Sequence, residues 1–559
     1  MRRLLIIFSA CALIQFLCQA QTLPLGSPVI EDYLRRQQLL GKFDTTFSFN
    51  FRPINFGKDR IQSDSSVFNP NDYFKTITTY LNGKGTLKLL PSELHTTFDS
   101  HHPYSRNDGA MIRSKGLQTL IRTGIYTEIG PLSIQLKPEF VSAQNLDYPG
   151  FPESFDDQKW SQRYVWFNTI DEPERYGENA YTKLGLGQSS VRLNKWGMSL
   201  GVSTENMWWG PALRNSIMMS NNAKGFEHIT FNTTRPQKTS IGNFEWQIAT
   251  GRLESSGFAP PDTARLDRGR KIYIPKVDDW RYFQGFSFSY SPKWISGLSL
   301  GLTRWTQTYS EYTKATKDYF PAFSNLFRNN DDNTGGRDEL QRDQAAGVFF
   351  RWLWFDSKAE FYMEFHRNDA SANFRDLILD SDHTRATTIG VNKLFETKSK
   401  NSFIQFNWEW TQMEQTGGRL LRNGLSWYIH GNVRHGFTNY GEVLGASIGP
   451  GSNVHYLSTS WVNGTNRIGV ALERLAHNND FLYFAFEDSR DFRRYWVDYN
   501  FHVFADWKFK NLLASGNIFY TRALNYQWEL FHVPFTQPYY VPGTDVGNLH
   551  LEFRLAYLL

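Results

Sequence analysis

An alternation of apolar and small polar residues, repeated along most of the chain, constrains this sequence more than any other feature. In residues 283–304, every second residue of two short runs is apolar: Phe286, Phe288 and Tyr290, then Leu298, Leu300 and Leu302. The residues between them are Ser, Gly or Thr, and a Ser-Pro-Lys turn joins the two runs. Successive side chains of a strand point to opposite sides. The pattern therefore predicts a hairpin with one apolar face and one polar face.

The same period returns from residue 116 to the last residue. At the end of the chain, alternate positions are apolar: Leu549, Leu551, Phe553, Leu555, Tyr557 and Leu559. His550, Glu552 and Arg554 occupy the other face of this strand. A terminal apolar strand of this kind resembles the end of bacterial outer-membrane barrels, although most of those end in Phe.

The first 20 residues read as an export signal. Arg2 and Arg3 precede an apolar run, and Cys18-Gln19-Ala20 predicts cleavage before Gln21. The alternative, a helical membrane anchor, is disfavoured because the run is shorter than the roughly 20 residues that a span needs. Both cysteines, Cys11 and Cys18, lie in this segment. The mature chain therefore has no disulfide, thiol nucleophile or cysteine-bound metal.

Composition narrows the fold class. Aromatic residues make up 16% of the chain, yet the mean hydropathy is negative. A large soluble sandwich or propeller could have this composition. A membrane barrel explains it directly, because half of each strand faces lipid, half faces a polar lumen, and aromatic residues collect at both interfaces. We predict an all-β fold, a transmembrane antiparallel β-barrel, and residues 116–559 provide for about 16 to 20 strands.

We divide the chain into three parts: a cleaved signal peptide (1–20), a helical N-terminal plug or lid on the periplasmic side (21–112), and the barrel (113–559). In the second part, Ser27 and Pro28 predict a helix start and Gly41 its end. Residues 69–80 are a second candidate helix. Polar stretches at 151–179, 258–279 and 311–344 are expected to be outer loops.

The sequence offers little for catalysis or metal binding. It has no nucleophile elbow, phosphate loop, nucleotide fingerprint or zinc motif. Asp331, Asn333 and Gly335 faintly resemble a calcium loop, but the required Glu is missing. His101 and His102 are interpreted as part of a solvated loop. Removal of Arg2 and Arg3 with the signal peptide takes the formal net charge from +5 to +3, and this nearly balanced charge argues against nucleic-acid binding. We expect no enzyme activity, no cofactor and no metal.

Two stretches depart from the alternation. Residues 205–222 contain Trp208 and Trp209, and residues 427–452 are rich in Gly. The second stretch carries four further candidate residues: His430, Arg434, His435 and Tyr440. Aromatic faces beside polar donors suit sugar rings, which present both C–H patches and hydroxyl groups. The alternative is an aromatic girdle with tight turns. These six residues are our candidate polysaccharide contacts.

These stretches also resemble a known family, the Wzi capsule-assembly proteins. The matching pieces are W-W-G-P with S-N-N-A-K (208–211, 220–224) and Y-I-H-G…H-G-F-T-N-Y-G-E-V-L-G…G-P-G-S (428–452). A third piece, D-Y-L-R-R-Q-Q-L-L-G-K (32–42), resembles relatives from Bacteroidetes-type bacteria. The resemblance implies a barrel of about 18 strands with periplasmic helices. It also implies lectins, not enzymes, that hold exported capsular polysaccharide at the cell surface.

Together these observations predict an outer-membrane barrel that binds capsular or extracellular polysaccharide and retains or assembles it at the surface. Its other expected partners are outer-membrane lipid and the barrel-assembly machinery. The rival functions are a porin or channel for small solutes and an outer-membrane enzyme. A plug formed by residues 21–112 argues against the channel, and the lack of a compact Ser/His/carboxylate motif argues against the enzyme.

Overall fold

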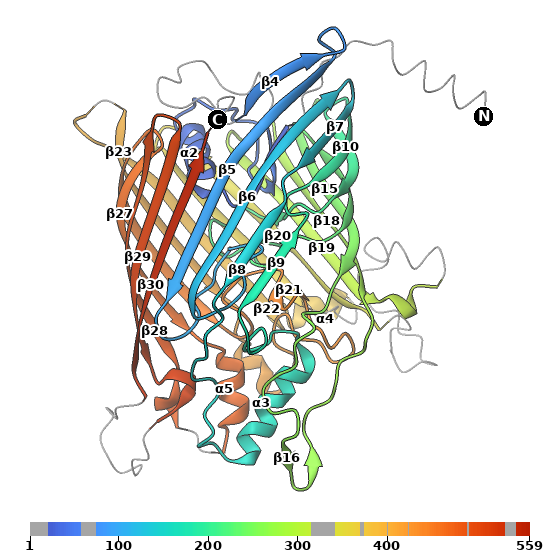
Figure 1. The fold of residues 1–559 in the computed structure, drawn as a ribbon, viewed down its shortest axis with the longest axis vertical. Helices are drawn as coiled ribbons and strands as arrows, with labels where there is room; N and C mark the ends of the chain where they lie inside the picture. Colours follow the sequence, from blue (N-terminus) through green and yellow to red (C-terminus); the bar gives the residue numbers. More distant parts are fainter. Residues whose placement is uncertain are drawn as a thin grey trace.

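A closed barrel of 18 antiparallel strands forms the wall of the molecule (Figure 1). The computed structural model describes residues 21–56, 74–314, 341–368, 374–399, 401–422, 424–488, 491–530 and 544–558. The predicted signal peptide lies outside the described residues. The elements of the wall are, in chain order, β5 (Gly85–Asp99), β6 (Gly116–Ile129), β7 (Leu132–Leu136), β8 (Glu139–Ala143), β9 (Tyr181–Gly185), β10 (Ser190–Lys195), β11 (Met198–Ser203), β13 (His228–Thr233), β15 (Gly242–Leu253), β18 (Arg281–Pro292), β19 (Leu298–Tyr309), β20 (Asp343–Trp354), β21 (Ala359–Asn368), β22 (Arg385–Glu396), β23 (Ser402–Gln412), β26 (Asn453–Asn463), β27 (Asn466–Ala476), β28 (Val497–Phe509), β29 (Leu512–Leu524) and β30 (Val546–Tyr557).

Two of the 18 strands are interrupted. β7 and β8 both pair with β6, and they are separated by Lys137 and Pro138. β10 pairs with β7 and β9 pairs with β8, so they too are two parts of one strand. Proline cannot donate to a ladder, which explains the first interruption. The wall closes where β30 pairs with β5, with Leu551 opposite Phe98.

The residues that alternate in the sequence lie on the two faces of the wall, with apolar side chains on the outer face and polar side chains on the inner face. On β28, Asn500 and His502 are buried, whereas Phe501 between them is exposed. The hairpin of β18 and β19 behaves in the same way: Ser287 and Thr303 are buried, and Phe288 lies opposite Leu302 on the outer face. Exposed apolar side chains around the whole wall are what lipid requires. The protein is therefore a transmembrane β-barrel. No helix among the described residues is long and apolar enough to span a membrane.

Connections at the two ends of the barrel differ in length. Those at the end that holds the C-terminus are tight turns, such as Gly130-Pro131 between β6 and β7. Those at the other end are long, and they include the stretches expected as outer loops around 151–179 and 258–279. In outer-membrane barrels the short turns face the periplasm and the long loops face outward. Most of the third expected loop, residues 315–340, lies outside the described residues.

A short N-terminal subdomain fills the periplasmic end of the lumen. It consists of β1 (Gln21–Leu23), α2 (Pro28–Leu39), β2 (Phe51–Arg52) and β3 (Ile54–Phe56). The predicted helix start at Pro28 is confirmed. Leu34, Phe47 and Phe49 form an apolar core with Leu513 and Leu558 of the wall region. Arg35 of α2 also forms a buried ion pair with Glu360 of β21, at 2.8 Å.

The structure corrects two expectations for residues 21–112. The wall begins at β5, inside the segment that we assigned to the plug, so the boundary at 112/113 is too late. β4 (Lys75–Tyr80) is a strand that pairs with β5, not a helix. Its run of Thr76, Ile77, Thr78 and Thr79 is β-branched, which favours strand. Residues 69–73 of that candidate helix lie outside the described residues.

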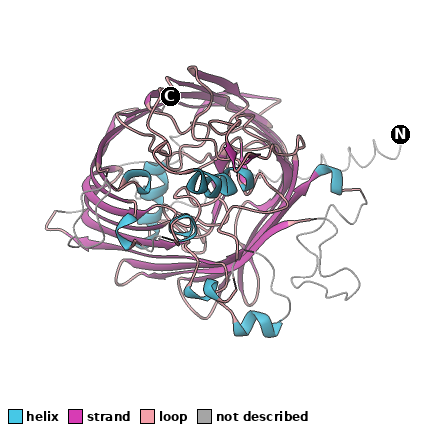
Figure 2. Ribbon diagram, turned by 90° about the horizontal axis from the view of Figure 1, so that it is seen from below, coloured by secondary structure: helices cyan, strands magenta, loops and turns pink. Residues whose placement is uncertain are grey.

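The outer half of the lumen is filled by the long connections. They contain α3 (Asp157–Thr169), α4 (Phe374–Leu379) and α5 (Asn479–Ala485), together with short elements: β12 (Trp208–Trp209), β14 (Gln237–Lys238), β16 (Leu266–Asp267), β17 (Arg270–Lys271), η4 (Ser310–Tyr312), η7 (Gly417–Leu420), β24 (Thr438–Asn439), β25 (Glu442–Val443), η8 (Phe492–Arg494) and η9 (Tyr526–Trp528). Seen along the barrel, several helices and loops lie within the ring of strands (Figure 2). A large apolar core joins these connections to inward-facing wall residues such as Phe283 and Phe349.

Candidate functional site

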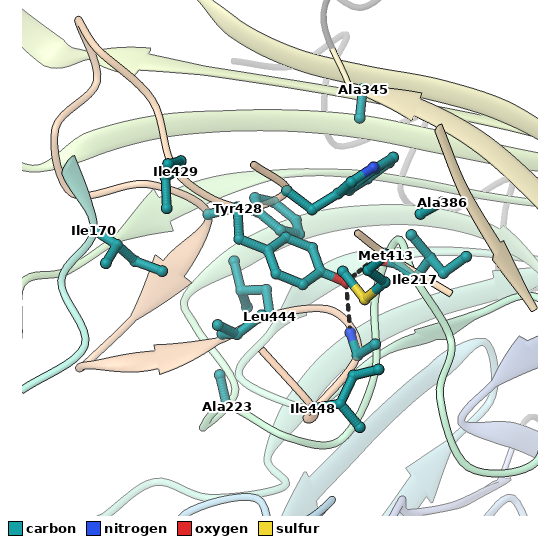
Figure 3. Packing of buried hydrophobic residues seen from close by; sticks show 14 of the residues in the cluster. Ile170, Ile217, Ala223, Ala345, Ala386, Met413, Tyr428, Ile429, Leu444 and Ile448 are labelled. Carbon is teal, nitrogen blue, oxygen red and sulfur yellow. Dashed lines mark hydrogen bonds between the residues drawn. The ribbon is translucent and has the colours of Figure 1, made fainter. Parts of the chain in front are cut away.

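The two stretches that break the alternation come together inside the outer half of the barrel. The hydroxyl of Tyr428 donates to the carbonyl of Ile217 at 2.8 Å and accepts from the amide of Ala446 at 2.7 Å. The amide of Ser220 donates to the carbonyl of Leu444 at 2.8 Å. Figure 3 shows Tyr428 at the centre of this packing, with Ile217, Leu444 and Met413 around it. The two stretches form one core, which we call the outer core.

Trp208 and Trp209 are buried at the inner side of the outer core. Together they form β12, which pairs with β2 of the N-terminal subdomain. The indole of Trp209 donates to the side-chain oxygen of Gln247 at 2.7 Å. The Arg52 guanidinium lies 4.8 Å from the centre of the Trp208 ring. A polymer at the outer surface does not reach either indole in this conformation, so a direct contact of these two residues with glycan is not supported.

His435 is also an internal residue. Its Nδ1 lies 2.9 Å from the hydroxyl of Tyr309, and its carbonyl accepts from the amide of Asp171. Burial, together with the positive charge of Arg281, lowers the pKa of His435 to about 2. The imidazole is therefore neutral at physiological pH. It links the outer core to the wall and to the end of α3.

His430 and Arg434 lie at the outer end, beside the end of α3. The backbone amide of His430 donates to the carbonyl of Thr169 at 3.1 Å. Arg434 donates to three backbone carbonyls: Asn168 at 3.0 Å, Pro275 at 2.9 Å, and Ile274. We call this surface the outer rim and define it by Thr169, Ile274, Pro275 and residues 430–434.

The outer rim combines polar and apolar exposed groups. Asn432 is exposed, and its backbone amide donates to Nδ1 of His430 at 3.2 Å. Ile274 is 54% exposed. Lys276 continues this surface, and its ammonium donates to the carbonyl of Phe167 at 2.7 Å. Sequence reasoning missed Asn432, Ile274 and Lys276. Asn432 lies within the Gly-rich stretch 427–452, whereas Ile274 and Lys276 lie in a loop whose sequence has no distinctive pattern.

Tyr440 lies away from the other five candidates, beside the interrupted strand of the wall. The ammonium groups of Lys183 and Lys224 lie 4.8 Å and 4.9 Å from the centre of its ring. Its backbone amide donates to the carbonyl of Glu254. The ring is half-buried. The structure therefore brings His430, Arg434 and His435 together and separates them from Tyr440 and from the two tryptophans.

A polar cavity of about 300 Å³ lies deeper in the lumen, between α2 and the wall. It is lined mainly by charged and aromatic residues, among them Arg35, Trp208, Arg214, Tyr456, Asp506 and Glu552. His95, Asp108 and Glu552 come close enough there to share an ion. Arg554 already contacts both carboxylates, at 3.5 Å for Asp108 and 2.5 Å for Glu552. The guanidinium supplies the positive charge that a metal would bring.

Comparison with known proteins identifies relatives. The family described as capsule assembly protein Wzi matches residues 99–517. Among solved structures, one similar protein is Wzi of Escherichia coli, described as an outer membrane protein involved in group 1 capsule assembly and a carbohydrate-binding β-barrel. It is 10% identical to this chain, with a TM-score of 0.58 over 96% of this chain and 99% of that one. OccAB2 of Acinetobacter baumannii is also 10% identical, with a TM-score of 0.37 over 84% and 97%. None of the curated proteins matches.

Proposed function

From the premise that this chain belongs to the Wzi capsule-assembly family, we propose that it is a lectin-like barrel that retains or assembles exported polysaccharide at the cell surface. The protein is located in the outer membrane, as its apolar wall requires. The polysaccharide is proposed to be the cell's own capsular or extracellular polymer. The related Escherichia coli protein is described as a carbohydrate-binding β-barrel involved in group 1 capsule assembly.

The observation that carries this proposal is the filled outer half of the lumen. The outer core packs against inward-facing wall residues, including Ala249, Phe283 and Phe349. In the described residues the outer end is therefore a solid surface rather than the mouth of a channel. A solid surface held in the membrane can retain a long polymer, whereas transport of small solutes needs an open path. The rival channel function is disfavoured on this ground.

We assign the polymer contacts to the outer rim. Arg434 keeps its candidate role, and Asn432, Ile274 and Lys276 join it. His430 is buried, and its Nδ1 accepts from the backbone amides of Asn432 and Val433, so it shapes the rim from below. Polar donors beside exposed apolar groups suit the two kinds of surface that a sugar ring presents. Each contact would be weak, but a repeating polymer that binds several copies of the protein gains avidity. Trp208, Trp209 and His435 support this surface from below.

The remaining parts of the proposal concern chemistry and partners. The protein binds without catalysing a reaction. Outer-membrane lipid covers the exposed apolar side chains of the wall. The barrel-assembly machinery inserts the chain, with β30 as the terminal strand that closes against β5.

The first test uses a deletion strain and measures how surface polysaccharide divides between washed cells and medium. We expect the same total amount of polymer, with a larger share in the medium. An unchanged division together with slower uptake of small solutes would contradict the proposal and favour the channel.

The second test measures binding of purified oligosaccharide fragments to protein with altered rim residues. The double variant Asn432→Ala, Arg434→Ala should bind about tenfold more weakly, because it loses polar contacts that include a charged group. The matched control is Arg268→Ala, an exposed arginine on the β16–β17 hairpin. Equal affinity of the double variant and the control would show that the polysaccharide binds at a surface other than the outer rim.

A further inference from the structure

The interrupted strand leaves an open edge in the outer half of the wall. β9 pairs with β8 on one side, with Tyr181 opposite Ala143. On its other side, no strand of the described residues pairs with it, because β11 ends at Ser203 and the chain turns inward. Thr182, Lys183 and Leu184 are all exposed, so both faces of β9 are accessible. In Figure 1, β9 lies beside β8 in the front of the wall.

This edge lies at the outer boundary of the apolar band. Ala143, the partner of Tyr181, also pairs with Gln118, close to the outer end of β6. Leu117, next to Gln118, is exposed on the lipid side, as are Leu184 and Leu186. β9 therefore passes from the hydrocarbon region into the level of the lipid headgroups. Unpaired backbone groups are costly in hydrocarbon, so this edge requires a polar partner.

Two lysines converge beside the open edge. The ammonium groups of Lys183 and Lys224 both lie within 5 Å of the centre of the Tyr440 ring. The Lys224 nitrogen also lies 2.9 Å from the place that a Cβ on Gly185 would take, so it sits against the backbone of β9. Burial, and then the charge of Lys183, lower the pKa of Lys224. A negative group between the two ammonium groups would relieve this repulsion.

Three carboxylates, Glu139, Glu227 and Glu254, line the cavity beside Lys224 and compensate the two charges in part; the charge of Glu139 raises the pKa of Lys224 against the effects of burial and Lys183. Glu139 forms an ion pair with Arg122 at 3.3 Å, and Glu254 forms one with Arg252. Glu227 is exposed at the edge of the same cavity. Among the residues that the structure describes, neither Lys183 nor Lys224 forms an ion pair. The cavity beside Lys224 and Tyr440 measures about 110 Å³, which is more than a single water needs and leaves room for a phosphoryl group.

We propose that this lateral opening binds the phosphorylated headgroup of an outer-leaflet lipid. Lys183 and Lys224 contact the phosphoryl oxygens, the free edge of β9 donates backbone N–H groups, and Leu184 and Leu186 contact the acyl chains. Basic groups at the membrane surface favour anionic headgroups in this way. The site is separate from the outer rim and does not depend on polysaccharide binding.

The test is native mass spectrometry of the full-length protein released from detergent, with lipid A as the probe. The wild-type protein should retain bisphosphorylated lipid A in preference to the dephosphorylated form with the same acyl chains. The variant Lys183→Gln, Lys224→Gln should lose about 25-fold in relative affinity for the phosphorylated form. Heat-modifiable migration on gels confirms that each variant is folded.

The matched control is Lys195→Gln. Lys195 also lies over an aromatic ring, at 4.3 Å from Trp196, but at the periplasmic end of the wall. It should retain lipid A as the wild type does. Equal retention of the two lipid forms by the wild type, or unchanged retention by the double variant, would overturn the proposal. A lipid-free dimer that persists at saturating lipid would also overturn it, by assigning the edge of β9 to a second copy of the chain.

Discussion

Two arginines share one buried carboxylate between the N-terminal subdomain and the wall. Glu360 lies 2.8 Å from Arg35 of α2 and 2.5 Å from Arg351 of β20. Asn392 donates a further hydrogen bond to Glu360, at 2.9 Å. A buried pair of this kind adds little net stability, but losing one partner leaves buried charge uncompensated. These contacts determine where α2 sits in the lumen.

We predict that Glu360→Gln destabilises the protein by about 3–5 kcal/mol, because two buried guanidinium groups lose their counter-charge. The free energy of unfolding in denaturant measures this effect. The control is Glu396→Gln, which removes an exposed carboxylate paired with Lys358 at 2.8 Å and should change stability little. Similar unfolding curves for both variants would show that α2 is held mainly by apolar packing.

Trp209 shows why an aromatic residue in a candidate binding stretch can be structural. Its ring packs so close to Gly285 of β18 that a Cβ there would lie 2.8 Å from the indole. A side chain at position 285 would thus displace the tryptophan. The close approach joins the outer core to the wall.

We predict that Trp209→Ala costs about 3–5 kcal/mol of stability in the outer core, through lost burial and the cavity left behind. Hydrogen exchange of the amides in residues 205–226 measures this local stability. Trp196→Ala is the control, since Trp196 is 68% exposed at the other end of the wall. Unchanged exchange in Trp209→Ala, with weaker oligosaccharide binding, would restore a direct role in glycan contact.

At the scale of elements, α5 is attached to the connection between β23 and β26 by several hydrogen bonds, and one of its anchors is a buried carboxyl group. Asp480 accepts from the hydroxyl of Ser426 and, at 2.8 Å, from the backbone amide of Gln415. Burial raises its pKa to about 6. The folded state therefore favours the protonated carboxyl, even though both hydrogen bonds favour the charged form.

This gives α5 a pH-dependent attachment. Because folding raises the pKa of Asp480, the protonated carboxyl group of this residue stabilises the folded state. This contribution is fully present below the unfolded pKa near 3.8 and is lost as pH rises through about 6. We predict that the local free energy of opening at α5 falls by up to about 3 kcal/mol between pH 4 and pH 7. Hydrogen exchange of the α5 amides, corrected for intrinsic rates, measures it.

Asp480→Asn should remove this pH dependence. Glu414 lies close enough to contribute to the raised pKa, so Glu414→Gln is the matched variant and should keep most of the slope. A slope that survives in Asp480→Asn would assign the titration to another group.

At the scale of the whole molecule, the barrel is closed at two levels. The N-terminal subdomain fills the periplasmic end, and the outer core fills the other. We predict that the purified protein adds little conductance to a planar bilayer, far less than an unplugged porin with a similar number of strands. Stable ohmic channels of porin size would contradict the closed lumen and revive the channel function.

Much of the wall could be predicted because a strand exposes its two faces residue by residue. The pairing of Phe288 with Leu302, and of Tyr290 with Leu300, lies in the hairpin predicted for residues 283–304. The outward positions of Leu549, Leu551 and Phe553 on β30 are confirmed as well; Leu559 lies outside the described residues. The start of the wall was missed because β5 lacks strict alternation at Leu89, Leu90 and Pro91, where its pairing register shifts.

The sequence by itself determined the barrel, because a period of two is a local property that any strand must satisfy when one face meets lipid and the other does not. It also pointed to the two stretches around Trp209 and Tyr428 that form one core. Only the tertiary structure decided which of their residues face inward. Tryptophan, histidine and glycine occur alike in a core, an aromatic girdle or a binding groove, so their presence in a stretch does not show whether they are buried. The burial of Trp209 depends on wall residues that are distant in sequence, such as Gln247 and Gly285.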